Sequence, residues 1–291
     1  MQNNEIIRIA VQKSGRLSEK SLSLIQDCGI DYSAGSRVLK AMADNFPMEF
    51  LFLRDDDIPE YVHDGIADIG IVGRNEVDEK GYEVDILRDL GFSRCRLSVA
   101  VPNTAAYKDL SFLEGRSVAT SYPNILKSCL QQQGVTADIH VVSGSVEIAP
   151  TIGLADAVFD IVSTGSTLIS NGLREVDTLY RSSAVLVARK GLAGIMPEKQ
   201  RIIERLLVRI DAVMRARHYK YILFNLPEEH IEQVSRIIPG MKSPTVTPLY
   251  KTGWISVQTV VKEDDFWEVL EALQGLGAQG ILVTSIEKMT S

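Results

Sequence analysis

Residues 159–168 read F-D-I-V-S-T-G-S-T-L, an apolar run that ends in hydroxyl side chains around one glycine. The apolar letters predict a buried strand, and the hydroxyl side chains predict that a helix begins directly after it. A helix that starts at the end of a strand offers unpaired backbone N–H groups and the positive end of its dipole to an anion. This stretch therefore predicts an α/β layer whose strand ends at an anion-binding turn.

A similar pattern occurs 92 positions earlier in the chain. The letters D-I-G-I-V-G at residues 68–73 align with D-I-V-S-T-G at 160–165, and E-V-D-I-L at 83–87 aligns with E-V-D-T-L at 175–179. Chance likeness is the alternative, because strand and helix units draw on similar residues. We interpret the repeat as two pseudo-symmetric lobes that face a cleft. A strand at residues 184–187 would return the chain to the first lobe.

Strand and helix patterns alternate through the first two thirds of the chain. Strands are expected at residues 6–11, 50–53, 68–72, 95–101, 117–120, 139–142, 157–162 and 184–187. Ser18 is expected to cap one helix, and Asp57 and Glu60 to form the capping box of another. A third helix is expected over residues 122–133. Short strands separated by helices indicate parallel α/β layers.

The last third of the chain has a different organisation. A long helix from residue 197 to about 217 is predicted by apolar residues at three- and four-residue spacing, among them Ile202, Leu206 and Ile210. The segments that follow are a strand at 220–225, a helix at 228–237, strands at 245–249 and 254–261, a helix at 264–273 and a strand at 280–286. The order β-α-β-β-α-β predicts a ferredoxin-like domain.

Composition limits the class of protein. The chain has 291 residues, of which 45% are hydrophobic and 24% charged, so two or three globular domains are expected. The formal net charge of -7 argues against a nucleic-acid surface, which needs a basic face. Three scattered cysteines suggest neither a disulfide framework nor a Cys-x-x-Cys metal site. With no signal-peptide pattern and no run of 18 apolar residues, a cytoplasmic protein is expected, with no membrane partner.

The hydroxyl-rich turn after residue 162 has the chemistry of a sugar-phosphate site. Ser163, Thr164, Gly165, Ser166 and Thr167 are expected to bind a phosphate. Asp160, on the preceding strand, would accept hydrogen bonds from sugar hydroxyls and is the residue expected to carry catalysis. A plain capped junction is the alternative. The acid followed by T-G-x-T resembles the 5-phosphoribosyl-1-pyrophosphate loop of phosphoribosyltransferases, although Phe159 replaces the usual second acid.

The wider sequence resembles the ATP phosphoribosyltransferase family in its long form. The likeness lies in I-R-I-A-V-Q-K-S-G-R-L-S, R-D-D-D-I-P, A-T-S-Y-P, G-S-V-E-I-A-P, D-I-V-S-T-G-S-T-L, N-G-L-R-E-V, Y-R-S and the later S-P-T and G-A-x-x-I-L. It implies a two-lobed catalytic core like that of periplasmic binding proteins, plus a C-terminal regulatory domain. The expected domains are residues 1–93 with 184–217 for the first lobe, 94–183 for the second lobe and 218–291 for the regulatory domain.

The resemblance also implies a reaction and its partners. The phosphoribosyl group of 5-phosphoribosyl 1-pyrophosphate would pass to N1 of ATP with release of pyrophosphate, as the first step of histidine biosynthesis under feedback inhibition by histidine. Mg²⁺ is the expected cofactor, held mainly by substrate phosphates with no dedicated protein ligand. Dimers and hexamers of the chain are implied.

The cleft residues follow from their places at strand ends and from the resemblance. The residues expected to contact ATP are Lys13, Arg16, Arg54, Asp68, Gly73, Ser121 and Tyr122. A solvated loop is the alternative for Lys13 and Arg16, an ion pair with Asp55 or Asp56 for Arg54, and a structural role for Asp68 and Gly73. Glu147 is expected to hold a ribose or a magnesium-bound water, or else to face a helix dipole.

The C-terminal domain is expected to bind histidine at contacts between domains through Ser243, Thr245 and Gly280. The alternative is that this domain only holds the oligomer together. Two other functions stay open from the sequence: a ligand-binding protein with the same two lobes, and a phosphoribosyltransferase that acts on another base.

Overall fold

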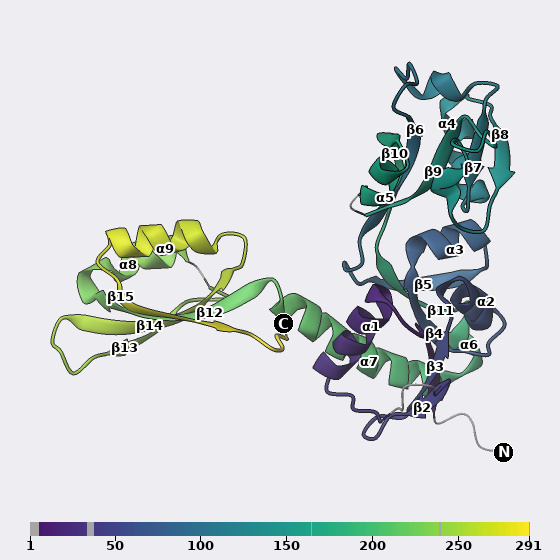
Figure 1. Cartoon of the computed structure of the whole chain (residues 1–291). Helices are drawn as coiled ribbons and strands as arrows, with labels where there is room; N and C mark the ends of the chain where they lie inside the picture. Colours follow the sequence, from purple (N-terminus) through teal and green to yellow (C-terminus); the bar gives the residue numbers. More distant parts are fainter. Residues whose placement is uncertain (1–5, 34–37, 164, 239, 291) are drawn as a thin grey trace. The chain divides into compact units, whose positions relative to one another are not determined.

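The computed structural model of the chain describes residues 6–33, 38–163, 165–238 and 240–290 (Figure 1). The chain divides into two compact units. The first unit comprises Met1–Ser23 with Ile30–Ile202, and the second comprises Leu24–Gly29 with Ile203–Ser291.

The first unit contains a six-stranded sheet in the order β2-β3-β1-β4-β11-β5. Its strands are β1 (Ile7–Gln12), β2 (Lys40–Met42), β3 (Met48–Leu53), β4 (Ile69–Gly73), β5 (Val84–Asp89) and β11 (Ala184–Arg189). β1 pairs in parallel with β3 and β4, while β11 pairs antiparallel with β4 and β5. The central strands are nearly continuous apolar runs because both faces of the sheet are covered.

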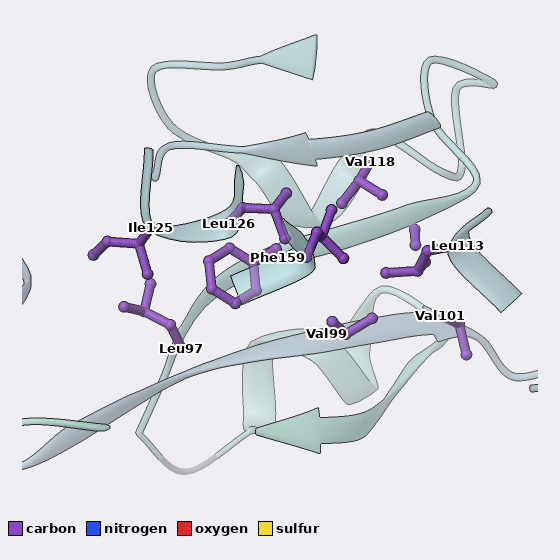
Figure 2. Packing of buried hydrophobic residues seen from close by; sticks show 10 residues of the cluster. Leu97, Val99, Val101, Leu113, Val118, Ile125, Leu126 and Phe159 are labelled. Atoms are coloured by element: carbon purple, nitrogen blue, oxygen red, sulfur yellow. The ribbon is translucent and has the colours of Figure 1, made fainter. Parts of the chain in front are cut away.

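A five-stranded sheet in the order β10-β6-β9-β7-β8 forms the other half of the first unit. Its strands are β6 (Cys95–Pro102), β7 (Ser117–Thr120), β8 (Asp138–Val141), β9 (Ala157–Val162) and β10 (Leu173–Ser182). Figure 2 shows its core, where the fully buried ring of Phe159 on β9 lies among Leu97 and Val99 of β6 and Ile125 and Leu126 of helix α4 (Pro123–Gln133). This packing fixes the strand that leads into the hydroxyl-rich turn.

The two sheets share one topology. β3-β1-β4-β11-β5 corresponds to β8-β7-β9-β6-β10, with three parallel strands followed by two strands in antiparallel pairing. β10 contains the repeated letters E-V-D, and β5 begins directly after the glutamate of the earlier E-V-D. Both strands occupy the same edge position in their sheets. The predicted pair of pseudo-symmetric α/β lobes is therefore confirmed. The chain passes to the second sheet at β6, directly after β5, and returns to the first sheet at β11, directly after β10.

The helices of the chain up to residue 216 are mostly short. They are α1 (Arg16–Asp27), η1 (Asp55–Asp57), α2 (Ile58–His63), α3 (Arg74–Lys80), η2 (Leu110–Leu113), α4, η3 (Val146–Ile148), α5 (Ser166–Ser170), α6 (Leu192–Ile195) and α7 (Pro197–Ala216). No helix in the described ranges is both long enough and apolar enough to span a lipid bilayer.

One predicted helix cap, Ser18, is wrong, and the other, Asp57, has the N-cap position of α2 without the predicted side-chain hydrogen bond. Ser18 lies inside α1, which begins at Arg16, and its side chain is buried. Asp57 has helical dihedral angles of φ -87° and ψ -23°, and its side chain makes no cap hydrogen bond, because the helical turn η1 leads straight into α2. In both cases the chain becomes helical before the polar residue that was expected to start the helix.

The second unit contains a four-stranded antiparallel sheet in the order β13-β14-β12-β15. Its elements after α7 are β12 (Tyr219–Pro227), η4 (Glu228–His230), α8 (Ile231–Ile237), β13 (Thr245–Pro248), β14 (Trp254–Lys262), α9 (Phe266–Gly275) and β15 (Gln279–Ser285). α8 and α9 lie over the same face of this sheet (Figure 1), where they cover Ile222, Phe224 and Val257. The predicted ferredoxin-like β-α-β-β-α-β domain is confirmed.

Candidate functional site

The carboxyl ends of β1, β3 and β4 meet at one edge of the six-stranded sheet, because these strands are parallel. Lys13 follows β1 and Arg54 follows β3, and the Lys13 N–H donates to the carbonyl of Leu53 at 2.8 Å. Arg16 opens α1 just beyond. Lys13 and Arg16 are exposed, and no carboxylate of the described ranges lies within salt-bridge distance of either. These two cations are available to an anionic ligand.

The hydroxyl-rich turn encloses a pocket of about 210 Å³ at the end of β9. Gly165 adopts φ +78°, which favours glycine, and it caps the N-terminus of α5. The lining brings together most of the residues predicted for the phosphoribosyl site, namely Glu147, Asp160, Ser163, Gly165 and Thr167. Thr164 lies outside the described residues, and Ser166 is exposed but does not line the pocket.

Asp160 carries a charge that the surrounding protein does not compensate. Its removal from water and the carboxylate of Glu147 raise its pKa to about 6, although the Ile161 N–H donates a hydrogen bond to it at 2.8 Å. The two carboxylates repel each other across the pocket, and both would gain from a ligand that brings hydroxyl donors or a cation. A pocket with paired acids beside a hydroxyl-rich turn fits a phosphorylated sugar.

A second pocket of about 560 Å³ lies where the two sheets of the first unit approach each other. We call it the junction pocket, and it is lined by Arg54, Asp55, Asp56, Glu76, Glu79, Lys80, Ser121, Tyr122, Pro123, Asn124, Val141, Val142 and Ser143. Three residues predicted to contact ATP, namely Arg54, Ser121 and Tyr122, therefore line the same pocket. Arg54 also pairs with Asp56 at 3.1 Å, so the ion pair that was the alternative for this residue is present.

The junction pocket and the phosphoribosyl pocket are neighbours. β7 pairs in parallel with β9, with Thr120 opposite Phe159, so Ser121 and Tyr122 lie beside Asp160 at the strand ends. Burial, and then the charges of Glu76 and Asp160 among others, raise the pKa of the Tyr122 hydroxyl. Ser121 donates to the carbonyl of Val142 at 2.7 Å, which ties the ends of β7 and β8 together.

Asp68 does not line the cleft, and the prediction that it contacts ATP is contradicted by its position. It precedes β4, at the amino end of the strand, and is 3% exposed. Lys199 donates to both of its oxygens at 2.8 Å, and the Arg8 N–H donates to one of them at 2.8 Å. The repeat aligned Asp68 with Asp160, but β9 begins three residues before its aspartate, at Ala157, whereas β4 begins after it.

Gly73 lies at the cleft end of β4, where the prediction placed it. A Cβ atom there would lie 2.5 Å from Oδ1 of Asn75, so the glycine is needed for the tight entry into α3. This contact supports the structural alternative for Gly73.

The acids of α3 are site residues that sequence reasoning missed. Glu79 is buried and accepts hydrogen bonds from the N–H groups of Asn124 at 3.1 Å and Ile125 at 3.0 Å, at the N-terminus of α4. Glu76 is also buried and accepts a hydrogen bond from Tyr122 at 3.0 Å. The letters R-N-E-V-D-E-K are typical of a solvated helix face, and only the contact with the other sheet's helix buries the two acids.

The residues predicted to bind histidine are not brought together within one copy of the chain. Thr245 lies on β13 and Gly280 on β15, which are the opposite edge strands of the sheet, with β14 and β12 between them. Ser243 and Thr245 are exposed. A pocket that contains both edges needs residues from elsewhere, such as a second copy.

The described residues contain no group of three or more His, Cys, Asp or Glu side chains arranged to hold a metal. The carboxylates of Asp160 and Glu147 are the pair that lines the phosphoribosyl pocket. Two carboxylates fit a hard cation that takes most of its oxygen ligands from water and phosphate.

Comparison with known proteins gives consistent matches. The family model described as ATP phosphoribosyltransferase matches residues 54–212, and the model described as HisG, C-terminal domain, matches residues 216–288. A curated ATP phosphoribosyltransferase of Cytophaga hutchinsonii is 54% identical over 284 residues, covering 98% of this chain and 98% of that protein. One of Parabacteroides distasonis is 53% identical, covering 98% and 99%.

One solved structure is similar in both fold and sequence. It is a chain of the ATP phosphoribosyl transferase (HisG:HisZ) complex from Thermotoga maritima, with a TM-score of 0.59 and 26% identity. The match covers 71% of this chain and 99% of that chain.

Proposed function

Since this chain belongs to the ATP phosphoribosyltransferase family, we propose that it transfers the phosphoribosyl group of 5-phosphoribosyl 1-pyrophosphate to N1 of ATP and releases pyrophosphate. Family membership makes the chain an enzyme of the first step of histidine biosynthesis. The observation that carries the proposed reaction is the pocket at the end of β9, where Asp160 and Glu147 face the hydroxyl-rich turn.

In this proposal the phosphoribosyl donor occupies that pocket. Backbone N–H groups and hydroxyls of the turn at Ser163, Gly165 and Thr167 bind the 5-phosphate. Asp160 accepts hydrogen bonds from the ribose hydroxyls. This arrangement leaves the anomeric carbon of the ribose facing the junction pocket, where ATP binds.

The protein has little covalent chemistry to supply, because pyrophosphate is already an activated leaving group. N1 of adenine uses its lone pair to form the new C–N bond while the bond from C1′ to the pyrophosphate oxygen breaks. Rate acceleration then comes from holding the two reactants in line and from stabilising charge on the leaving group. Lys13, Arg16 and Arg54 provide the positive charge for the phosphates at the carboxyl ends of β1 and β3.

Mg²⁺ is the cofactor that this arrangement fits. Bound mainly through substrate phosphates, it would neutralise the charge of the departing pyrophosphate. Asp160 and Glu147 are the protein carboxylates that would hold it or its waters.

We also propose the division of labour among the domains. Residues 1–93 with 184–217 form the first catalytic lobe, 94–183 form the second lobe, and 218–291 form a regulatory domain that binds histidine and lowers the rate. Because Thr245 and Gly280 lie on opposite sheet edges, the histidine pocket would combine one edge from each of two copies. That requirement supports a homo-oligomer, in keeping with the dimers and hexamers expected from the family.

A pyrophosphate-release assay tests the reaction. Purified protein is mixed with ATP, 5-phosphoribosyl 1-pyrophosphate and Mg²⁺, and each component is omitted in turn. Release is expected only in the complete mixture. Release that persists without ATP, or that needs another purine instead, would point to a different acceptor.

A further inference from the structure

Glu76 of α3 is a buried acid that lines the junction pocket, and it forms no ion pair within the described ranges. The residue is 7% exposed. One oxygen, Oε1, accepts hydrogen bonds from the hydroxyl of Tyr122 at 3.0 Å and from Nδ2 of Asn75 at 2.8 Å. Within the described ranges no donor lies within hydrogen-bond distance of Oε2. Oε2 is therefore open to the junction pocket, where a ligand donor can reach it, because it is not one of the fully buried atoms that lack a partner.

The surroundings of Glu76 select the kind of ligand group it can bind. Burial raises its pKa, the hydrogen bond from Tyr122 lowers it, the charges of Asp55 and Asp56 on η1 raise it further, and Lys80 lowers it. The other buried acid of the helix, Glu79, has both oxygens engaged by the N-terminus of α4. This part of the pocket therefore favours a hydrogen-bond donor, above all one that becomes positively charged.

Tyr122 places this acid next to the reacting centre. Its hydroxyl contacts Glu76. Tyr122 follows β7 in the chain, and Asp160 lies on the neighbouring strand β9 at the same end of the sheet. A nucleobase held between the two pockets would therefore have Glu76 on one side and the sugar donor on the other.

We propose that Glu76 binds the 6-amino group of the adenine ring through Oε2 and accepts a proton from it as N1 is alkylated. This inference rests on the proposed function. Attack by the N1 lone pair forms the N1–C1′ bond, and the electron pair of the broken C1′–O bond leaves with pyrophosphate. The ring gains one positive charge, spread over N1, C6 and the 6-amino nitrogen. Transfer of one proton from that nitrogen to Glu76 leaves a neutral 6-imino ring, and Glu76 later releases the proton to water.

The same contact makes Glu76 a specificity-determining residue. A 6-oxo purine such as that of inosine triphosphate presents an acceptor at C6, which would face the carboxylate oxygen without a hydrogen between them. A site built to accept a hydrogen bond rejects a ligand that lacks the donor. Glu76→Gln would place an amide N–H in the pocket, where it can donate to the oxo group, while its oxygen keeps Tyr122 and Asn75.

Isothermal titration of the full-length chain with ATP and with inosine triphosphate tests the inference. The wild type is expected to bind ATP about 100-fold more tightly or better, and E76Q to reduce this ratio to about tenfold or less. E76Q is also expected to lower kcat more than it raises KM for ATP. Asp78→Asn is the control, since Asp78 lies on the same helix but does not line the junction pocket; it should keep the wild-type ratio.

An unchanged ATP-to-inosine-triphosphate ratio in E76Q overturns the inference, and so does an equal change in the Asp78→Asn variant. If E76Q does not fold, the wild type is titrated with purine riboside triphosphate, which lacks the 6-amino group. Binding about tenfold weaker than ATP supports the role of Glu76, and equal binding overturns it. The proposed function fails separately, if the wild type releases no pyrophosphate from the complete reaction mixture.

Discussion

At the scale of single residues, Asp160 shows how a fold can keep an acid in an unfavourable state for the benefit of a ligand. Its pKa of about 6 comes from burial and from Glu147, and no cation of the described ranges pairs with it. A side chain kept only for stability would gain a partner or be replaced. The unfavourable environment therefore supports a role in binding the sugar.

Replacing Asp160 by asparagine separates these roles. Asn keeps the shape but removes the charge, so Asp160→Asn is expected to lower kcat/KM for 5-phosphoribosyl 1-pyrophosphate by about 100-fold. Steady-state kinetics measures this loss. Ser170→Ala, at the C-terminal end of α5 and outside the pocket lining, serves as the control and should keep the wild-type value. A loss of activity matched by a loss of folded protein would instead indicate a structural aspartate.

The difference in melting temperature between Asp160→Asn and the wild type should depend on pH. The folded-state pKa of about 6 lies above the ordinary value of 3.8, so between these values the folded protein holds a proton that the unfolded chain releases. The charged carboxylate therefore destabilises the fold fully above pH 6 and not below about pH 4. Asp160→Asn should melt at a higher temperature than the wild type at pH 8, and the gap should close on acidification. A variant that melts lower at pH 8 would contradict the shift.

Residue-level prediction from sequence worked where a residue's partners are close in the chain. The end of β9 and the start of α5 after Gly165 could be predicted because strand, glycine and hydroxyls follow one another directly. The buried ion pair of Asp68 could not be predicted, because its partner Lys199 lies 131 positions away and no local pattern signals such a pair.

At the scale of elements, the ion pair of Lys199 with Asp68 joins α7 to the start of β4. Side chains of both are nearly buried, at 9% and 4% exposed. Removing one partner of such a pair leaves an uncompensated charge inside the protein, which costs more than the pair itself contributes.

Lys199→Met is expected to lower the free energy of unfolding of the first unit by about 3–5 kcal/mol. The double variant Lys199→Met with Asp68→Asn should lose less, because asparagine can still accept from Arg8 without carrying a charge. Urea denaturation followed by circular dichroism measures both. Losses that simply add would show that the two side chains do not interact.

Strands were easier to predict than the ends of helices. β7 and β9 match their predicted bounds because each is an apolar run between polar turns. β10, which has ten residues, was missed because it lies at a sheet edge and alternates polar and charged letters such as R-E-V-D-T. Its pairing with β6, and not its own hydrophobicity, makes it a strand.

At the scale of the whole molecule, the sequence repeat predicted the two lobes but misaligned their ends. Topology follows from the order of strands, which a repeat preserves. The junction pocket could not be foreseen, because it depends on how α3 meets the N-terminus of α4, elements that are more than 40 positions apart.

Histidine is expected to lower the rate of the complete reaction through the second unit. Thr245→Ala should raise the histidine concentration that halves the rate by about tenfold, since one lost hydrogen bond to a charged ligand costs roughly 1.5 kcal/mol. The measurement is the ratio of inhibited to uninhibited rate within each variant. Thr247→Ala, two residues along the same exposed strand, is the control. Equal shifts in both variants would place the amino-acid site elsewhere.

The return of β11 to the first sheet has a consequence for synthesis on the ribosome. β11 lies between β4 and β5, so the first sheet stays incomplete until residue 189 has left the exit tunnel. Until then β4 has an open edge and β5 has no neighbour, and open edges promote association between nascent chains. Translation of the second sheet thus sets the earliest moment at which the first can close.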